Sequence, residues 1–179
     1  ASYNPAGNAF YSEDLSAGSS GWSNNGTHEY SATRDDTGAQ ISGIMHGLFA
    51  QDGYYEKTIS INSTIGETVF VNGKFFLIDS WDYNPNVGYE QDTGKVFLND
   101  EEKVFFKSGT AGAGLTIFQG SDFVTDTYAI SGFNNKWGEQ EFVVEFSIPY
   151  VMTSDELTIK FQIGLNSNTS DESGGFTVD

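Results

Sequence analysis

Two stretches decide the fold: Phe142-Val-Val-Glu-Phe-Ser-Ile148 and Leu157-Thr-Ile-Lys-Phe-Gln-Ile163. In both, large apolar side chains occupy every second position, with mostly polar side chains between them. Because a β-strand turns successive side chains to opposite faces, this period predicts strands with one face in a core and the other in water. A helix would need a period near 3.6, which no segment of the sequence sustains for more than two turns.

The same alternation continues along the rest of the chain. Val69 and Val71, then Phe75 and Leu77, predict two strands around a turn at Asn72-Gly73. Further short strands are expected at Ile41–Ala50, Tyr55–Ile61, Lys95–Asn99, Lys103–Lys107, Leu115–Phe118 and Phe123–Ile130. About ten strands with Gly, Asn, Asp and Ser between them predict an all-β fold. We expect one domain over residues 1–179, an antiparallel β-sandwich of the jelly-roll type.

The composition is strongly acidic, with 25 Asp and Glu against 8 Lys and Arg and a net charge of −17. Such a surface repels nucleic acids and anionic membranes, since phosphate binding needs clustered basic side chains. There is no cysteine, which excludes disulfides and thiolate metal sites. No apolar run reaches the ~18 residues of a membrane helix. We expect a monomeric module, not inserted in a membrane, whose abrupt ending at Phe176–Asp179 suggests excision from a longer surface protein.

An acidic loop follows one of the predicted strands. After Leu77-Ile78 come Asp79 and Asp82, and the loop continues Asp82-Tyr-Asn-Pro-Asn-Val-Gly-Tyr-Glu90. Asp82, Asn84 and Asn86 place oxygen side chains at alternate positions with a glycine soon after, a spacing that can wrap around one Ca²⁺ ion. The match to an EF-hand is partial, because Gly88 comes one position late and no helices flank the loop. An ordinary solvated turn remains the alternative.

A second acidic segment lies near the end of the sequence. Asp171 and Glu172 are adjacent in a Gly/Ser-rich stretch, and Asp179 follows a short apolar strand. Carboxylates that converge on one point repel each other unless a cation or a proton neutralises them. The candidate metal ligands are therefore Asp79, Asp82, Asn84, Glu90, Asp171, Glu172 and Asp179, with Ca²⁺ as the cofactor and the calcium loops at one rim of the sandwich. A polar surface loop is the alternative reading of this segment.

The order of these motifs resembles a known family. Phe76-Leu-Ile-Asp-Ser-Trp-Asp82, Val96-Phe-Leu-Asn-Asp100 and Asp171-Glu-Ser-Gly-Gly-Phe-Thr-Val-Asp179 are similar to the calcium-dependent ligand-binding domains of very long bacterial RTX-type adhesins, above all their peptide-binding domain. The resemblance implies an extracellular jelly-roll module on the bacterial surface that captures protein or peptide ligands of another cell. It also implies Asp79, Asp82, Asp171 and Asp179 as calcium ligands. The family box commonly continues straight into Gly-Glu, whereas residues 83–89 intervene here before Glu90.

Two other functions compete with adhesion. A sandwich glycoside hydrolase needs two carboxylates across a cleft, which Glu139 and Glu141 could supply. The Glu-x-Asp-x-x-Glu pattern of sandwich glucanases is absent, as is a Gly-x-Ser-x-Gly elbow, so we expect no enzyme.

A carbohydrate-binding module would stack its ligand on exposed rings. Most of the 15 phenylalanines occupy core-type positions, whereas Trp81, Tyr83, Tyr89 and Trp137 lie in or beside polar loops and are the candidate ligand-binding residues. The same rings could line a peptide groove, so the sequence leaves peptide and glycan ligands both open. Trp22, in contrast, is expected to pack in the core.

Overall fold

The computed structural model describes residues 21–24, 54–61, 65–79, 92–108, 115–130, 141–164 and 172–178, and the statements below concern those residues. They form strands and one short 3-10 helix, η2. In chain order the elements are β1 (Ser23–Asn24), β2 (Tyr54–Ser60), β3 (Thr68–Asp79), β4 (Thr93–Leu98), β5 (Glu101–Ser108), β6 (Leu115–Gln119), η2 (Ser121–Phe123), β7 (Val124–Ile130), β8 (Glu141–Val151), β9 (Glu156–Gly164) and β10 (Glu172–Val178).

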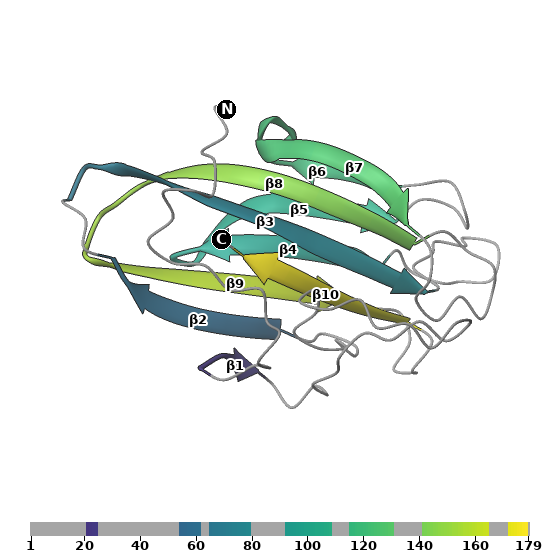
Figure 1. Cartoon of the computed structure of the whole chain (residues 1–179), viewed down its shortest axis with the longest axis horizontal. Helices are drawn as coiled ribbons and strands as arrows, with labels where there is room; N and C mark the ends of the chain where they lie inside the picture. The colour runs from purple at the N-terminus through teal and green to yellow at the C-terminus, as the bar shows by residue number, and fades with distance from the viewer. Residues whose placement is uncertain are drawn as a thin grey trace.

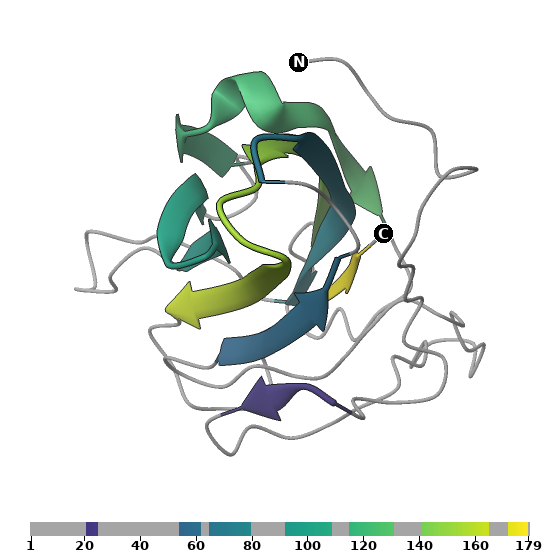
Figure 2. The same cartoon turned by 90° about the vertical axis from the view of Figure 1, so that its left-hand side faces the viewer.

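The strands form two antiparallel sheets that pack face to face. The six-stranded sheet has the order β1-β2-β9-β4-β5-β6, and the four-stranded sheet has the order β10-β3-β8-β7. Figure 1 views the sandwich with the four-stranded sheet in front, and Figure 2 shows the two layers from the side. The predicted all-β sandwich is confirmed, since every neighbouring pair of strands is antiparallel.

The path of the chain is that of a jelly roll. Strand β2 pairs with β9 in one sheet, and β3 pairs with β8 in the other, so the second pair is nested inside the first along the chain. The connections β2 to β3 and β8 to β9 both cross from one sheet to the other. Nested pairs that alternate between two sheets produce the rolled hairpin that defines this fold.

The core lies between the sheets and is rich in aromatic rings. Phe75 of β3 meets Phe106 of β5 edge to face with ring centroids 5.1 Å apart, and Phe161 of β9 lies 6.0 Å from Phe75. All three side chains are fully buried. Trp22 is also buried and packs against Phe161, as expected from the sequence. Aromatic pairs of this geometry add about 0.5–1.5 kcal/mol each to the stability gained from burial alone.

The predicted turn at Asn72-Gly73 is wrong. Strand β3 runs through both residues, and its pairing with β8 continues from Thr68 to Leu77 without a register shift. The amide of Asn72 is buried, and its Oδ1 accepts a hydrogen bond of 2.7 Å from the Ser147 hydroxyl of β8. A cross-strand partner for the amide therefore replaces the local turn that an Asn-Gly pair favours when no neighbouring strand is available.

One end of the sandwich is closed by short connections. Its described residues are 61, 65–67, 99–100, 120–123 and 152–155, and we call it the tight end. Asn99 and Asp100 have φ of 47° and 64°, so β4 and β5 are joined by a two-residue turn of the primed type. Asn99 then binds two other strands: its Oδ1 accepts the Thr158 amide at 2.8 Å, and its Nδ2 donates to the Tyr150 hydroxyl at 3.0 Å.

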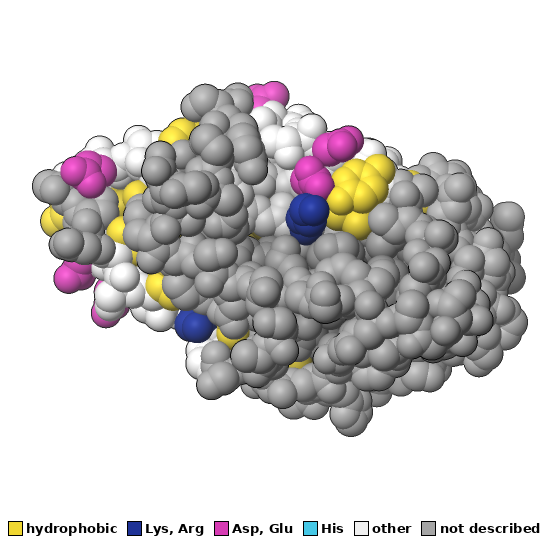
Figure 3. Space-filling model, in the orientation of Figure 1, with side chains coloured by type: hydrophobic (Ala, Val, Ile, Leu, Met, Phe, Trp, Pro, Cys, Tyr) yellow, Lys and Arg dark blue, Asp and Glu magenta, His cyan; other side chains and the backbone are white. Residues whose placement is uncertain are grey.

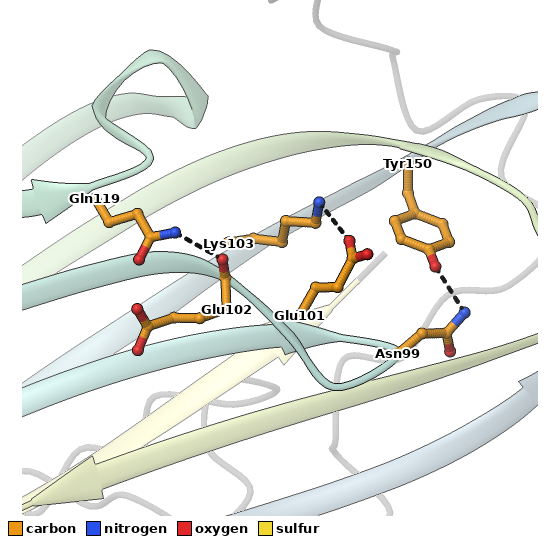
Figure 4. A network of polar contacts seen from close by, with 6 residues as sticks. All are labelled: Asn99, Glu101, Glu102, Lys103, Gln119 and Tyr150. Carbon is orange, nitrogen blue, oxygen red and sulfur yellow. Dashed lines mark hydrogen bonds and ion pairs between the residues drawn. The ribbon is translucent and has the colours of Figure 1, made fainter.

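The same turn is held by further polar contacts, which Figure 4 shows. Lys103 Nζ lies 2.8 Å from Glu101 Oε2, and Gln119 Nε2 donates to the carbonyl oxygen of Glu102 at 2.9 Å. The tight end thus ties both sheets together through side chains as well as backbone. No helix in the described part of the chain has the length and apolar character needed to cross a bilayer.

Candidate functional site

The opposite end of the sandwich carries the long connections. Strands β3, β5, β7 and β9 end there, and β4, β6, β8 and β10 begin there (Figure 1). We call this end, defined by these strand termini, the long-connection end. The segments that join the strands in sequence are 80–92, 109–114, 131–140 and 165–171, and apart from Asp92 they lie outside the described residues. Most of the metal and ligand residues predicted from the sequence belong to the first and last of these connections or to the strands beside them.

The strand register places Asp79 and Glu172 directly opposite each other. Asp79 is the last residue of β3, Glu172 is the first of β10, and the two are paired in the antiparallel ladder. Directly opposed residues of such a ladder have their Cβ atoms about 4.5–5.5 Å apart, and like charges there destabilise the pair of strands. The two acidic segments, distant in sequence, therefore begin side by side at the edge of the four-stranded sheet.

The other predicted site residues lie outside the described residues. These are Trp81, Asp82, Tyr83, Asn84, Tyr89, Glu90, Trp137, Asp171 and Asp179. Of Asp79 and Glu172 the structure describes the backbone position. Within the described segments no group of three or more His, Cys, Asp or Glu residues is arranged to hold a metal ion.

Asp92 is a buried carboxylate that the sequence analysis did not single out. It stands just before β4 at the long-connection end, has no exposed surface, and has interaction partners within the chain. Aspartate is almost never fully buried unless it is paired, because desolvation disfavours its charge. Its sequence signal was an acidic residue directly before an alternating strand. Asp92 therefore marks a buried acidic position at the start of β4.

The outer face of the six-stranded sheet carries basic and aromatic side chains in a regular arrangement. We call it the lysine–phenylalanine stripe; its members are Lys95, Lys107, Lys160, Phe97, Phe105 and Phe118. Each lysine lies over a phenylalanine of the next strand: Lys160 Nζ is 4.5 Å from the Phe97 ring centroid, Lys95 Nζ is 4.8 Å from that of Phe105, and Lys107 Nζ is 4.8 Å from that of Phe118. The expectation that phenylalanines serve the core therefore does not hold for this face.

The outer face of the four-stranded sheet carries a smaller polar cluster. The Glu145 carboxylate of β8 accepts a 2.9 Å hydrogen bond from the Tyr128 hydroxyl and lies 3.4 Å from Lys74 Nζ. Partial burial, this hydrogen bond and the negative charges of Glu145 and Asp126 raise the pKa of Tyr128 to about 12. Figure 3 shows this face, where acidic and basic side chains lie next to each other over the strands. A phenol held in its neutral form is a hydrogen-bond donor and has no role as a base.

The central part of the outer face of the four-stranded sheet is buried. Val143, Ser147 and Asn72 belong by strand alternation to the outer face, and all three are buried. The central part of β3 and β8 is thus packed on both sides. Within the described part of the chain, the end of β3 and the outer face of the six-stranded sheet therefore remain as candidate binding surfaces.

Comparison with known proteins assigns the chain to no family. No protein-family model matches the chain, and no curated protein is significantly similar to it. Among solved structures, a family 35 carbohydrate-binding module from an environmental isolate shares 14% sequence identity, with a TM-score of 0.39 over 89% of this chain and 86% of that one. A likeness at this level does not bear on ligand or chemistry, and the sandwich assignment follows from the strand pairing described above.

Proposed function

We propose that the chain is a calcium-dependent, non-catalytic adhesion module of a bacterial surface protein that captures a protein or peptide on another cell. The observation that supports the proposal is the register of β3 and β10, which makes Asp79 and Glu172 direct neighbours. Two opposed carboxylates repel each other, and a divalent cation removes that repulsion.

The donor set of the two acidic segments fits calcium. Calcium takes six to eight oxygen ligands, commonly carboxylates, Asn carbonyls and backbone carbonyls. Asp79 and Glu172 would supply carboxylates from two strands, and Asp82, Asn84, Glu90, Asp171 and Asp179 are the further candidates. Bound calcium would join the 80–92 connection to the 165–171 connection, and with them the candidate ligand-binding rings Trp81, Tyr83 and Tyr89.

The first test is thermal and chemical unfolding with and without EGTA, followed by addition of calcium or magnesium. Calcium at 100 times its Kd should stabilise the fold by about 2.7 kcal/mol, and equal magnesium should not. Asp79→Asn should abolish the calcium response. In EGTA the same variant should be more stable than the natural chain by about 0.2–1 kcal/mol, since one of the two opposed charges is gone.

Asp155→Asn is the matched control, because Asp155 is an exposed aspartate at the tight end. It should keep the full calcium response. A melting temperature that EGTA leaves unchanged would refute the calcium site, and with it the adhesion mechanism proposed here. Asp79→Asn should lower the stability of the fold in calcium and raise it in EGTA. A merely structural role of this residue would not produce this reversal of sign.

The ligand class is tested by screening peptides and glycans in calcium and in EGTA. Calcium-dependent binding of peptides supports the proposal. Calcium-dependent binding of glycans alone would replace the peptide ligand by a sugar, which makes the module lectin-like. Turnover of any glycan would instead indicate a glycoside hydrolase.

A further inference from the structure

The lysine–phenylalanine stripe consists of two parallel diagonals across adjacent strands. Lys160, Lys95 and Lys107 lie on β9, β4 and β5, and each is shifted by two residues relative to the one before. The rings follow the same diagonal one strand further on, because Phe97 is the register partner of Lys160 and Phe105 that of Lys95. With ~4.8 Å between strands and ~3.3 Å per residue, successive lysine positions are about 8 Å apart.

The charge of the stripe is only partly balanced by acidic side chains of the described residues. Among the described residues, Lys107 and Lys160 form no ion pair, whereas Lys95 Nζ lies 3.2 Å from Glu102 Oε1. Only 8 basic residues are present in a chain with 25 acidic ones, and three of the 8 belong to the stripe. Two ammonium groups that form no ion pair within the described residues are unexpected in so acidic a protein.

Sheet stability explains part of this arrangement. Cation–π contacts between neighbouring strands contribute about 0.5–1 kcal/mol each at exposed sites and cover apolar rings. They do not require the lysines to be left without carboxylate partners, nor Phe118 to keep 56% of its surface exposed at the end of the stripe. An exposed ring beside a net positive charge is a feature of a binding surface.

We propose that the stripe binds an acidic polysaccharide, a polymer whose sugar rings carry carboxylate or sulfate groups. The ammonium groups complement the anionic groups, and Phe118, the exposed ring of the stripe, contacts the apolar face of a sugar ring. A peptide fits less well, since extended peptides bind through free backbone groups at a sheet edge or in a groove. Strands β9, β4 and β5 are paired on both sides, so their face offers side chains only.

The net charge of −17 does not prevent this interaction. At physiological ionic strength the Debye length is about 8 Å, so a polyanion on the stripe is affected mainly by the charges closest to it. Within the described residues, those charges are the three lysines, Glu102, and Glu56, which is the register partner of Lys160. The local balance is therefore slightly positive.

This surface is separate from the calcium site proposed above. It lies in the middle of the six-stranded sheet and uses no carboxylate of the long-connection end. Binding of the polyanion should therefore persist in EGTA at temperatures below unfolding, and in the Asp79→Asn variant. Failure of the calcium proposal would leave this one standing, and the reverse also holds.

The experiment measures binding of the full chain to immobilised polygalacturonate, heparin, dextran and polyglutamate at about 0.15 M salt. The double variant Lys107→Gln/Lys160→Gln is compared with Lys74→Gln/Lys103→Gln, which changes the net charge equally at two lysines outside the stripe. Melting temperatures verify that both variants are folded. Phe118→Ala tests the exposed ring without altering charge.

We expect binding to polygalacturonate, to heparin or to both, which tells carboxylate from sulfate recognition, and none to neutral dextran. The stripe variant should bind at least about ten-fold more weakly, because charge-assisted contacts are lost. The control variant should stay within about two-fold, and Phe118→Ala should weaken binding. Absence of polysaccharide binding, equal losses in the two double variants, loss of binding in EGTA, or equally tight binding of polyglutamate would each overturn the proposal.

Discussion

The two ends of the sandwich differ in how the chain closes them. At the tight end, short connections are fixed by hydrogen bonds such as Ile61 amide to Asp155 carbonyl at 2.8 Å and Met152 amide to Glu67 carbonyl at 2.8 Å. At the other end the connections are long, and both acidic segments begin there from neighbouring strands. A sandwich needs only one well-tied end to hold its register. The other end is then available for longer, ligand-binding connections, since loops on a rigid scaffold commonly carry function.

The largest effect that would sharpen this comparison is expected at Gly120, in the connection between β6 and β7. Its φ of +75° is unfavourable for other residues, and a Cβ there would collide with the backbone carbonyl oxygen of Lys103. Gly120→Ala should lower the free energy of unfolding by about 3 kcal/mol or more, as measured by urea unfolding.

Gly66 is the matched control for that substitution. Its φ of +95° is also positive, but nothing lies within 4 Å of a Cβ built there. Gly66→Ala should therefore lose only the conformational term of about 1–2 kcal/mol. Equal losses at the two positions would mean that close packing at Gly120 does not stabilise the tight end.

A smaller effect is expected at Asn99, which joins the β4–β5 turn to β9 and β8. Asn99→Ala removes two hydrogen bonds of about 1 kcal/mol each and leaves an alanine at positive φ, for a loss of about 2–4 kcal/mol. Asn99→Gly, which relieves the backbone, isolates the hydrogen bonds and should lose about 2 kcal/mol. Both losses should be the same in calcium and in EGTA. A loss of stability that depends on calcium would mean that the tight end and the long-connection end are energetically coupled, which contradicts this prediction.

The smallest effect on stability is expected at Tyr128, on the outer face of the four-stranded sheet. Because folding raises the pKa of Tyr128 from 10.0 to about 12, the unfolded chain releases this proton first as pH rises. Its contribution is therefore fully present below pH 10 and is lost between about pH 10 and 12. Tyr128→Phe should show a shallower fall of stability over this range. In an absorbance titration the natural chain should show a late-titrating phenol that Tyr128→Phe lacks. An identical pH dependence of the two chains would contradict the assignment.

Much of the fold could be predicted from the sequence, because strand alternation is a local property. The segments around Phe142–Ile148 and Leu157–Ile163 became β8 and β9, and Tyr55–Ile61 corresponds to β2. The turn at Asn72-Gly73 failed for a tertiary reason: β8 pairs with both residues, and β10 pairs with Gly73. The backbone hydrogen bonds of the continuous β3–β8 ladder outweigh the local turn preference of the Asn-Gly pair.

The candidate site, too, could be predicted from the sequence only in part. Acidic residues at Asp79 and Glu172 were recognisable from composition and order, whereas their direct pairing depends on the register of β3 and β10. The lysine–phenylalanine stripe was not foreseen, because its members come from four strands and alternate with core residues in each. No spacing within one strand indicates which residue of another will lie opposite.

The sequence by itself determined an acidic, cysteine-free, all-β chain with period-two strands, because charge, composition and side-chain alternation are read residue by residue. Only the tertiary structure decided which strands are neighbours, which end is tight, which acidic positions are paired in the ladder and where lysines meet rings. Strand pairing is a long-range choice that buries apolar faces and satisfies backbone hydrogen bonds across the whole sheet, so a register shift of one residue would turn every side chain to the other face.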